Sequence, residues 1–143
     1  MFFFYGLLQP GFSNAASRLV ARKLTPLGAA MTKGTLFAIE GPSGAYPALI
    51  PGATGTVHGS LYAKGPQWED SDLARLDKFE NVVPSRPGQS EYRRAVIDLI
   101  GPDGDALTAT AYIYPERPKG ARRILTSDFA YWLKVSGKRA WRD

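Results

Sequence analysis

The chain contains no cysteine and a single histidine, His58. The lack of cysteine excludes disulfides, thiolate metal sites and a cysteine nucleophile, and one histidine cannot supply a cluster of histidine ligands. No apolar run approaches the roughly 18–20 residues that span a bilayer, and the short apolar N-terminus lacks the basic lead-in of a signal peptide. We therefore expect a cytoplasmic protein that does not enter a membrane.

Internal repeats and low-complexity segments are also absent from the 143 residues, of which 44% are hydrophobic and 22% charged. This length and composition predict one globular domain, residues 1–143, large enough to bury a core.

The net charge is +5, and the basic residues are concentrated towards the C-terminus. They are Arg117, Lys119, Arg122, Arg123, Lys134, Lys138, Arg139 and Arg142, with Trp132 and Trp141 among them. Basic residues beside aromatic ones can follow a phosphate backbone and stack on bases. No nucleic-acid-binding motif accompanies them, so we interpret the tail as a solvated basic helix and do not expect nucleic acid as a partner.

The first eleven residues, Met1–Gly11, combine an apolar run with a loop. Three phenylalanines and Tyr5 favour a strand, which Gly6 and then Pro10 interrupt. One interpretation is a buried first strand with an ordinary turn. In the other, Gly6 adopts backbone angles closed to other residues, and the loop turns successive N–H groups towards one oxygen anion. The pattern alone does not separate the two.

Periodicity predicts the remaining elements. Short helices are expected over 14–24, ended by Pro26 and Gly28, and over 127–135. Strands are expected over 34–40, 46–50, 54–64, 91–100 and 106–114, the last two joined by a hairpin-type turn. In the strand 54–64, Val57 and Leu61 share one face, His58 and Tyr62 share the other, and Gly59 marks a bulge or a close approach. These elements predict an α+β chain built on a curved, mostly antiparallel sheet or small barrel.

The clearest helix is expected over 69–80, where Leu73, Leu76 and Phe79 recur every third residue. Its first turn is acidic, which suits the positive end of the helix dipole, but Asp77 and Glu80 lie at the end that disfavours negative charge. Glu80 is therefore either a solvated helix-end residue or a carboxylate held in a pocket that raises its pKa. Composition does not decide between these two.

Seven short segments occur in a characteristic order over residues 2 to about 115. They are Tyr5-Gly6-Leu7-Leu8 with Gly11, Gly34-Thr35-Leu36-Phe37, Tyr46-Pro47-Ala48, Val57-His58-Gly59-Ser60-Leu61-Tyr62, Leu76-Asp77-Lys78-Phe79-Glu80, Tyr92-Arg93-Arg94 and Ala111-Tyr112-Ile113-Tyr114. In this order and spacing they resemble the motifs of the gamma-glutamylcyclotransferase-like superfamily.

The resemblance implies a mixed, mostly antiparallel β-barrel of about six strands with flanking helices. The core would cover about 2–115, followed by a C-terminal helical extension over about 116–143. A cavity would lie at the barrel mouth, and the expected partner is a small-molecule γ-glutamyl substrate.

The resemblance also implies a reaction in which the free α-amine of a γ-glutamyl group attacks its own γ-carbonyl. This releases 5-oxoproline and an amine or amino acid. Glu80 matches the family's general acid/base, and the N–H groups around Gly6, Leu7 and Leu8 would hold the oxyanion or the substrate carboxylate. This chemistry requires no metal or organic cofactor.

Tyr5, Tyr92 and Tyr114 are expected to line the substrate pocket. For Tyr92 and Tyr114, ordinary packing with a hydrogen-bonded hydroxyl is an equal alternative. Arg94 is expected to stabilise the fold through a carboxylate partner rather than to touch substrate.

Two positions depart from the family pattern. Leu7 replaces a small hydroxyl residue, and Asn81 replaces a glycine that Asn can imitate in a left-handed turn. The change at Leu7 supports an alternative function, a ligand-binding or protein-interaction module without turnover. The leaving group stays open between an amino acid, a lysine-type linkage, a polyamine-like amine and a biosynthetic intermediate, and the sequence does not indicate an oligomeric state.

Overall fold

The computed structural model describes residues 1–142. Its elements, in chain order, are β1 (Phe2–Phe4), α1 (Ala15–Lys23), β2 (Leu24–Gly41), β3 (Gly44–Lys64), α2 (Asp70–Phe79), a short 3-10 helix (Pro87–Gln89), β4 (Arg93–Ile100), β5 (Ala106–Ile113), β6 (Arg122–Ile124) and α3 (Phe129–Ser136). Within these residues, no helix is long and apolar enough to cross a membrane.

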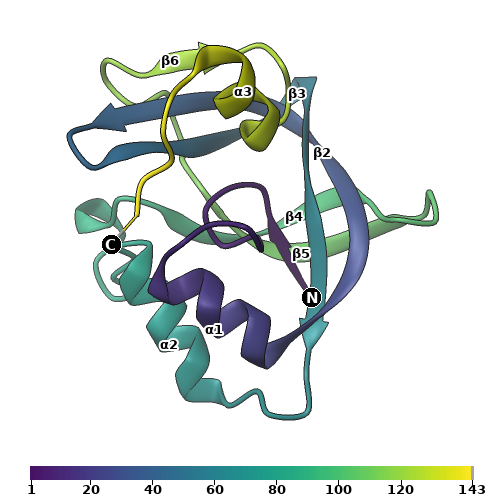
Figure 1. The fold of residues 1–143 in the computed structure, drawn as a ribbon. Coiled ribbons are helices and arrows are strands. Elements are labelled where there is room, and N and C mark those ends of the chain that lie inside the picture. The colour runs from purple at the N-terminus through teal and green to yellow at the C-terminus, as the bar shows by residue number, and fades with distance from the viewer. Residues whose placement is uncertain (143) are drawn as a thin grey trace.

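Five strands close into a barrel (Figure 1). The strand order is β3-β1-β5-β4-β2, and pairing of β2 with β3 completes the ring, while β6 pairs with the outer part of β2. The β1–β5 contact is parallel and the other pairs are antiparallel. The predicted α+β fold, a mixed and mostly antiparallel barrel with flanking helices, is confirmed.

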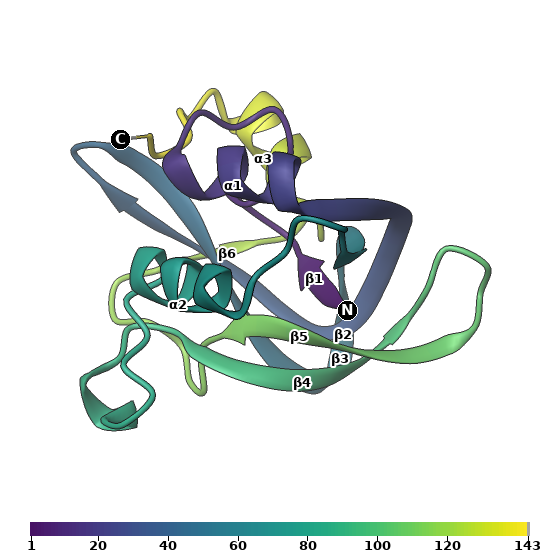
Figure 2. The same ribbon diagram turned by 90° about the horizontal axis from the view of Figure 1, so that it is seen from below.

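The hairpin of β2 and β3 is much longer than the sequence predicts. Segments 34–40, 46–50 and 54–64, expected as separate strands, belong to two continuous ones, and Pro26 and Gly28 lie in β2 instead of ending a helix. Register shifts between Pro26 and Gly28 and between Lys33 and Gly34 absorb these residues as irregularities. They coincide with the strong bend of β2 visible in Figure 2. Because of the bend, one end of the hairpin forms part of the barrel wall and the other end extends beyond it, where β6 pairs with β2.

Side chains of β1 alternate between two cores. Phe3 is fully buried inside the barrel with residues such as Leu36 and Leu61. Phe2 and Phe4 face the opposite way, towards the two helices α1 and α2, which lie side by side (Figure 1). Tyr62, predicted on a polar face, is only 2% exposed because it packs against Phe4 under these helices. Gly59 is a close approach, as predicted: a Cβ there would meet the Phe4 carbonyl oxygen at 2.5 Å.

The helices α1 and α2 both have well-defined starts. Asn14 is fully buried, and its Oδ1 accepts a 2.7 Å hydrogen bond from Ser17 N–H in a capping box. At the start of α2, Asp72 Oδ2 accepts a 2.9 Å hydrogen bond from Glu69 N–H. The acidic first turn predicted for this helix therefore supplies its N-terminal cap, which fixes where the helix begins.

Candidate active site

The loop after β1 forms one wall of a cavity. Gly6 begins a turn in which Gln9 N–H donates to the Gly6 carbonyl at 3.1 Å, and the Leu7 carbonyl accepts from Asn14 Nδ2 at 2.9 Å. The N–H groups of Gly6, Leu7 and Leu8 have no protein acceptor within residues 1–142. Three adjacent free donors are the arrangement that can hold an anion.

Glycine at position 6 serves a different purpose from the one predicted. Its backbone does not adopt a left-handed conformation. A Cβ at this position would instead collide with the ring of Pro47 on β3. Gly6 is required because the loop passes this close to β3, which brings the loop amides to the cavity.

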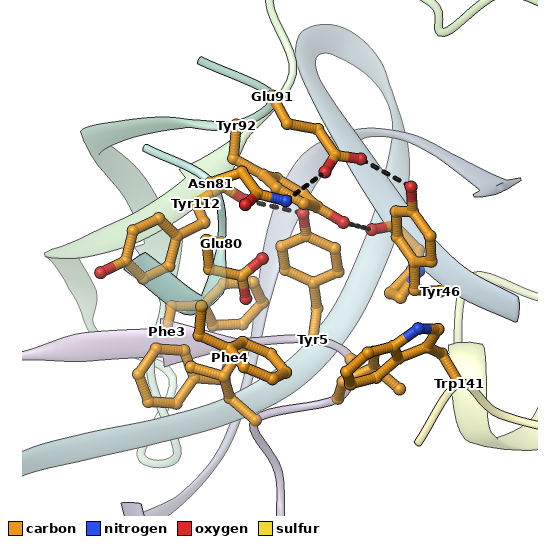
Figure 3. A pocket seen from close by; sticks show the side chains of 15 residues that line it. Phe3, Phe4, Tyr5, Tyr46, Glu80, Asn81, Glu91, Tyr92, Tyr112 and Trp141 are labelled. Carbon is orange, nitrogen blue, oxygen red and sulfur yellow. Dashed lines mark hydrogen bonds between the residues drawn. The ribbon is translucent and has the colours of Figure 1, made fainter. Parts of the chain in front are cut away.

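The cavity lies between this loop, the end of α2 and the barrel wall, and has a volume of about 170 Å³. A single water needs only about 10–15 Å³ by this measure, so the cavity admits a small organic molecule. Its lining is mostly aromatic and apolar. The lining residues are Phe3, Phe4, Tyr5, Gly6, Leu7, Leu8, Tyr46, Pro47, Phe79, Glu80, Asn81, Glu91, Tyr92, Tyr112 and Trp141 (Figure 3).

Glu80 is the C-cap of α2 and is 7% exposed. Its carboxyl group has no hydrogen bond or ion pair to any residue in 1–142, and it lines the cavity. Burial, with a smaller contribution from the negative charge of Glu91, raises the pKa of Glu80 from 4.5 to about 8. Asn81 follows with a φ of 55°, the left-handed turn expected there, and turns the chain away from the pocket. Of the two alternatives left open by the sequence, the structure shows the buried carboxylate.

Asp77, one turn earlier, has a structural role. One of its oxygens is paired with Arg94 on β4, and the other accepts a 2.8 Å hydrogen bond from the Tyr112 hydroxyl on β5. These contacts tie the end of α2 to the barrel. The expectation that Arg94 stabilises the fold through a carboxylate is therefore confirmed.

Tyr5 and Tyr92 line the cavity with their rings, but their hydroxyls bind the backbone. Tyr5 Oη donates to the Tyr112 carbonyl at 2.6 Å and accepts from Leu49 N–H at 3.1 Å, and Tyr92 Oη donates to the Pro47 carbonyl at 2.6 Å. Burial raises the pKa of both hydroxyls well above their usual range, so both remain protonated. Each of these two side chains therefore lines the cavity with its ring, and its hydroxyl proton is already donated to a backbone carbonyl.

Tyr114 does not lie in the cavity lining within residues 1–142. It packs edge-on against Tyr92, with ring centroids 4.7 Å apart, and its hydroxyl donates to Glu91 at 2.6 Å. Of the two alternatives left for this residue, the structure therefore shows packing with a hydrogen-bonded hydroxyl.

Several lining residues were not predicted as site residues, among them Tyr46, Glu91 and Trp141. Glu91 accepts hydrogen bonds from Tyr46 Oη at 2.6 Å and from Asn81 Nδ2 at 3.0 Å, in addition to Tyr114 (Figure 3). Tyr46 stands in the Tyr-Pro-Ala segment, which is the one sequence signal that pointed to it. Glu91 and Trp141 carried no such signal, because their neighbours in space are far away in sequence.

The described residues contain no group of three or more metal-ligating side chains. The chemistry available in the cavity is that of one unpaired carboxyl group, a set of free N–H donors and aromatic walls. Groups of these kinds can transfer protons and bind anions.

The comparison with known families agrees with this geometry. The family described as Gamma-glutamyl cyclotransferase, AIG2-like, matches residues 2–133. The chain belongs to this family. Membership of the gamma-glutamyl cyclotransferase family confirms the resemblance found in the seven sequence segments.

Solved structures of similar fold include three from different organisms. YkqA from Bacillus subtilis has a TM-score of 0.66 at 19% identity, covering 95% of this chain and 41% of its own. An AIG2-like protein from Mus musculus has a TM-score of 0.59 at 23% identity, and the match covers 82% of this chain and 79% of the mouse protein. Protein ytfP from Escherichia coli has a TM-score of 0.55 at 28% identity, and the match covers 90% of this chain and 94% of ytfP. The chain thus spans less than half of the Bacillus subtilis protein, and no curated protein sequence matches it significantly.

Proposed function

We propose that the protein catalyses intramolecular cyclotransfer on a γ-glutamyl conjugate, with Glu80 as general acid/base. The observation that carries the proposal is a buried carboxyl group without a protein partner, in the same cavity as the free N–H groups of the Gly6–Leu8 loop. An unpaired carboxylate in an apolar cavity costs stability, so its presence there points to a chemical role.

The proposed reaction begins with the substrate α-amine attacking the γ-carbonyl carbon. A carbon–nitrogen bond forms, the carbonyl becomes a tetrahedral oxyanion, and the amine loses a proton to Glu80. The loop amides of Gly6, Leu7 and Leu8 hold the oxyanion or the substrate carboxylate. Glu80 then returns the proton to the leaving nitrogen, the bond to that nitrogen breaks, and 5-oxoproline and a free amine leave.

One residue can serve both steps because the proton it accepts is the proton it returns. A pKa of about 8 suits this exchange, since the α-amine has a pKa of about 7.7–8.0 and the best acid/base catalyst has a pKa near the working pH. The ring closure is intramolecular, so the aromatic walls need only hold the conjugate in a folded conformation.

The proposal is tested by measuring 5-oxoproline release from a panel of γ-glutamyl amino acids and γ-glutamyl amines. We expect release by the parent protein and a loss of about 100-fold or more for Glu80→Gln, which keeps the size of the side chain and removes the base. Glu116→Gln, at an exposed position outside the cavity, is the matched control and should keep full activity. Equal release by parent and Glu80→Gln would contradict the role of Glu80.

The alternative, a binding module without turnover, rests on Leu7. This side chain is 7% exposed and packs in the barrel core, so the loop offers no side-chain hydroxyl at this position. Under this alternative, γ-glutamyl ligands raise the melting temperature of the parent protein while no 5-oxoproline is released. The loop N–H groups can hold an oxyanion without a side-chain hydroxyl, so the catalytic function remains the leading proposal.

A further inference from the structure

The side chain of Asn14 connects the start of α1 with the loop after β1. It is fully buried and lies outside the lining of the cavity. Its Oδ1 accepts a 2.7 Å hydrogen bond from Ser17 N–H, and its Nδ2 donates a 2.9 Å hydrogen bond to the Leu7 carbonyl. Turning the amide over would place two donors together at Ser17 and two acceptors together at Leu7, so one orientation alone satisfies both contacts. The loop is therefore held at a defined position relative to the helix.

Capping of α1 uses only half of this side chain. An N-cap needs an oxygen that accepts from the first turn of the helix, and aspartate or serine supplies it as well as asparagine does. Asparagine differs from these two in carrying an N–H donor as well, and at Asn14 that donor is directed at Leu7 and not at the helix. The second hydrogen bond therefore serves the loop.

The hydrogen bond to Leu7 sets the direction of the next N–H group. All peptide bonds in residues 1–142 are trans. In a planar trans peptide, the carbonyl of one residue points opposite to the N–H of the next. The Leu7 carbonyl points towards Asn14, away from the cavity lining, so the Leu8 N–H points to the other side of the loop, where Leu7 and Leu8 line the cavity. This N–H has no protein acceptor within residues 1–142 and can face a ligand.

The preceding peptide is fixed in a similar way by the loop itself. The Gly6 carbonyl accepts from Gln9 N–H at 3.1 Å and from Gln9 Nε2 at 3.4 Å. Ser60 Oγ donates to Gln9 Oε1 at 2.9 Å, which ties that side chain to β3. The Leu7 N–H must point opposite to the Gly6 carbonyl. Two neighbouring peptides are thus each held by a hydrogen bond to the carbonyl, and the N–H group of each is left free.

We propose that Asn14 is a positioning residue for the anion-binding loop. By holding the Leu7 carbonyl, it prevents the peptide between Leu7 and Leu8 from turning over and placing that carbonyl oxygen in the cavity. A carbonyl oxygen there would repel an oxyanion or a carboxylate, whereas the N–H group attracts it. The donor is thus oriented before the substrate arrives, so no reorganisation is needed during the reaction. This inference rests on the proposed function, in which the loop holds an anion.

Asn14→Ser separates the two roles of this side chain. Serine keeps an oxygen that can cap α1 and removes the donor to the Leu7 carbonyl. Ser17→Ala is the matched control, because it weakens the capping box and leaves the contact between Asn14 and Leu7 in place. Residual dipolar couplings measured by NMR report the direction of individual N–H groups. We expect the coupling of the Leu8 N–H to change in Asn14→Ser and to keep its parent value in Ser17→Ala, and an unchanged coupling in Asn14→Ser overturns the inference.

Binding and turnover provide a second measurement. The probe is 5-oxoproline, which carries both a carboxylate and a carbonyl oxygen. In Asn14→Ser its dissociation constant should rise, and kcat/KM for 5-oxoproline release should fall, each by about tenfold or more, the usual effect of losing one charge-assisted hydrogen bond. Both quantities should stay close to their parent values in Ser17→Ala. Equal losses in the two variants would show that the start of α1 acts only through stability, which overturns the inference.

Should Asn14→Ser not fold, the parent protein still decides. Titration of the parent with 5-oxoproline should shift the amide signal of Leu8, and no response of that amide overturns the inference.

Failure of the proposed function gives a different result. If the parent releases no 5-oxoproline but the Leu8 coupling changes in Asn14→Ser alone, Asn14 positions the loop as inferred and the cyclotransferase is overturned. If the parent releases 5-oxoproline and Asn14→Ser has the same kcat/KM, the cyclotransferase stands and the inference is overturned.

Discussion

Asp77 and Glu80 lie one turn apart at the end of α2 and are almost equally buried, 6% and 7% exposed, but only Asp77 has partners within residues 1–142. Arg94 and Tyr112 satisfy its two oxygens. Glu80 faces the cavity with both oxygens unpaired by protein groups. The same helix end thus holds one carboxylate for the fold and keeps another available for chemistry.

The unpaired carboxyl group makes stability depend on pH. The pKa of Glu80 is about 8 in the folded protein, above its usual 4.5, so folding favours the protonated form. This contribution is complete below about pH 4.5 and is lost as the pH rises through about 8. Glu80→Gln should therefore be more stable than the parent at pH 8, by on the order of 4 kcal/mol, and nearly equal to it at pH 4.5. Denaturant unfolding at both pH values measures the difference, and a constant offset between the two proteins would contradict it.

Asp77→Asn should have the opposite effect on stability. The change leaves Arg94 without its counter-charge and weakens the hydrogen bond from Tyr112, which should cost about 1–3 kcal/mol at neutral pH. Asp70→Asn, at an exposed position in the first turn of the same helix, is the control and should cost a few tenths of a kcal/mol. Thermal unfolding of the parent, Asp77→Asn and Asp70→Asn proteins measures these differences in stability. A fully stable Asp77→Asn protein would show that the contact with Arg94 and Tyr112 does not secure the helix.

Activity should rise with pH and level off above about pH 8. The proposed attack needs a neutral α-amine and an ionised Glu80 that can accept its proton, so both groups must be deprotonated beforehand. With pKa values of about 8 for both groups, kcat/KM should fall steeply below about pH 8 and change little above it.

Glu91→Gln should move the acidic limb of this profile to lower pH. The charge of Glu91 contributes to the raised pKa of Glu80, so its removal lowers that pKa. A profile that keeps its acidic limb in Glu91→Gln would show that Glu91 does not influence Glu80. NMR titration of the Glu80 carboxyl carbon provides the same comparison without any substrate.

Gly6→Ala should damage the site through the backbone. The added Cβ collides with the ring of Pro47, so the loop must move away from β3 and carry its N–H groups with it. We expect a loss of about 1–3 kcal/mol in stability, as for other overpacked positions, and a larger fall in kcat than in binding. Gly88→Ala is the control, because a Cβ there meets nothing within 4 Å. If Gly6→Ala and Gly88→Ala have the same stability and kcat, the close approach of Gly6 to Pro47 does not matter for function.

Gly44→Ala should release the C-terminal segment from β3. Gly44 has a φ of 121°, and a Cβ on it would lie 2.6 Å from the Ala140 carbonyl carbon and from Trp141 N. The strain should cost about 1–3 kcal/mol, and acrylamide should quench tryptophan fluorescence more strongly than in the parent. Gly41→Ala, in the same hairpin turn with open space around it, should leave quenching unchanged. Unchanged quenching in Gly44→Ala as well would mean that Trp141 does not depend on this contact.

The parts of the site that the sequence predicts are those set by local chemistry. The acidic first turn and the three-residue spacing of Leu73, Leu76 and Phe79 located α2, and with it the position of Glu80. The loop at Gly6 was also predictable from its composition, although the reason for glycine was wrong: the crowding by Pro47 comes from β3, and no local pattern shows it.

Other features depend on contacts between distant residues. Pro26 and Gly28 were predicted to end a helix, but a register shift accommodates both inside β2. The short β6 was missed because its only signal is a few basic residues, and it becomes a strand by pairing with the outer part of β2. Glu91 and Trp141 reach the cavity from the end of a long loop and from the C-terminal segment, so neither could be assigned without the fold.

The position of β1 also has a consequence for how the protein is made. Phe2 pairs with Tyr62 of β3 on one side and with Thr110 of β5 on the other. A ribosome therefore releases this strand, with its run of phenylalanines, long before either neighbour exists. Until β5 emerges, β1 has at least one open edge, which is the kind of surface that recruits chaperones or other nascent chains. Chains that stop before residue 106 should therefore aggregate, since they lack the strand that closes the barrel around β1.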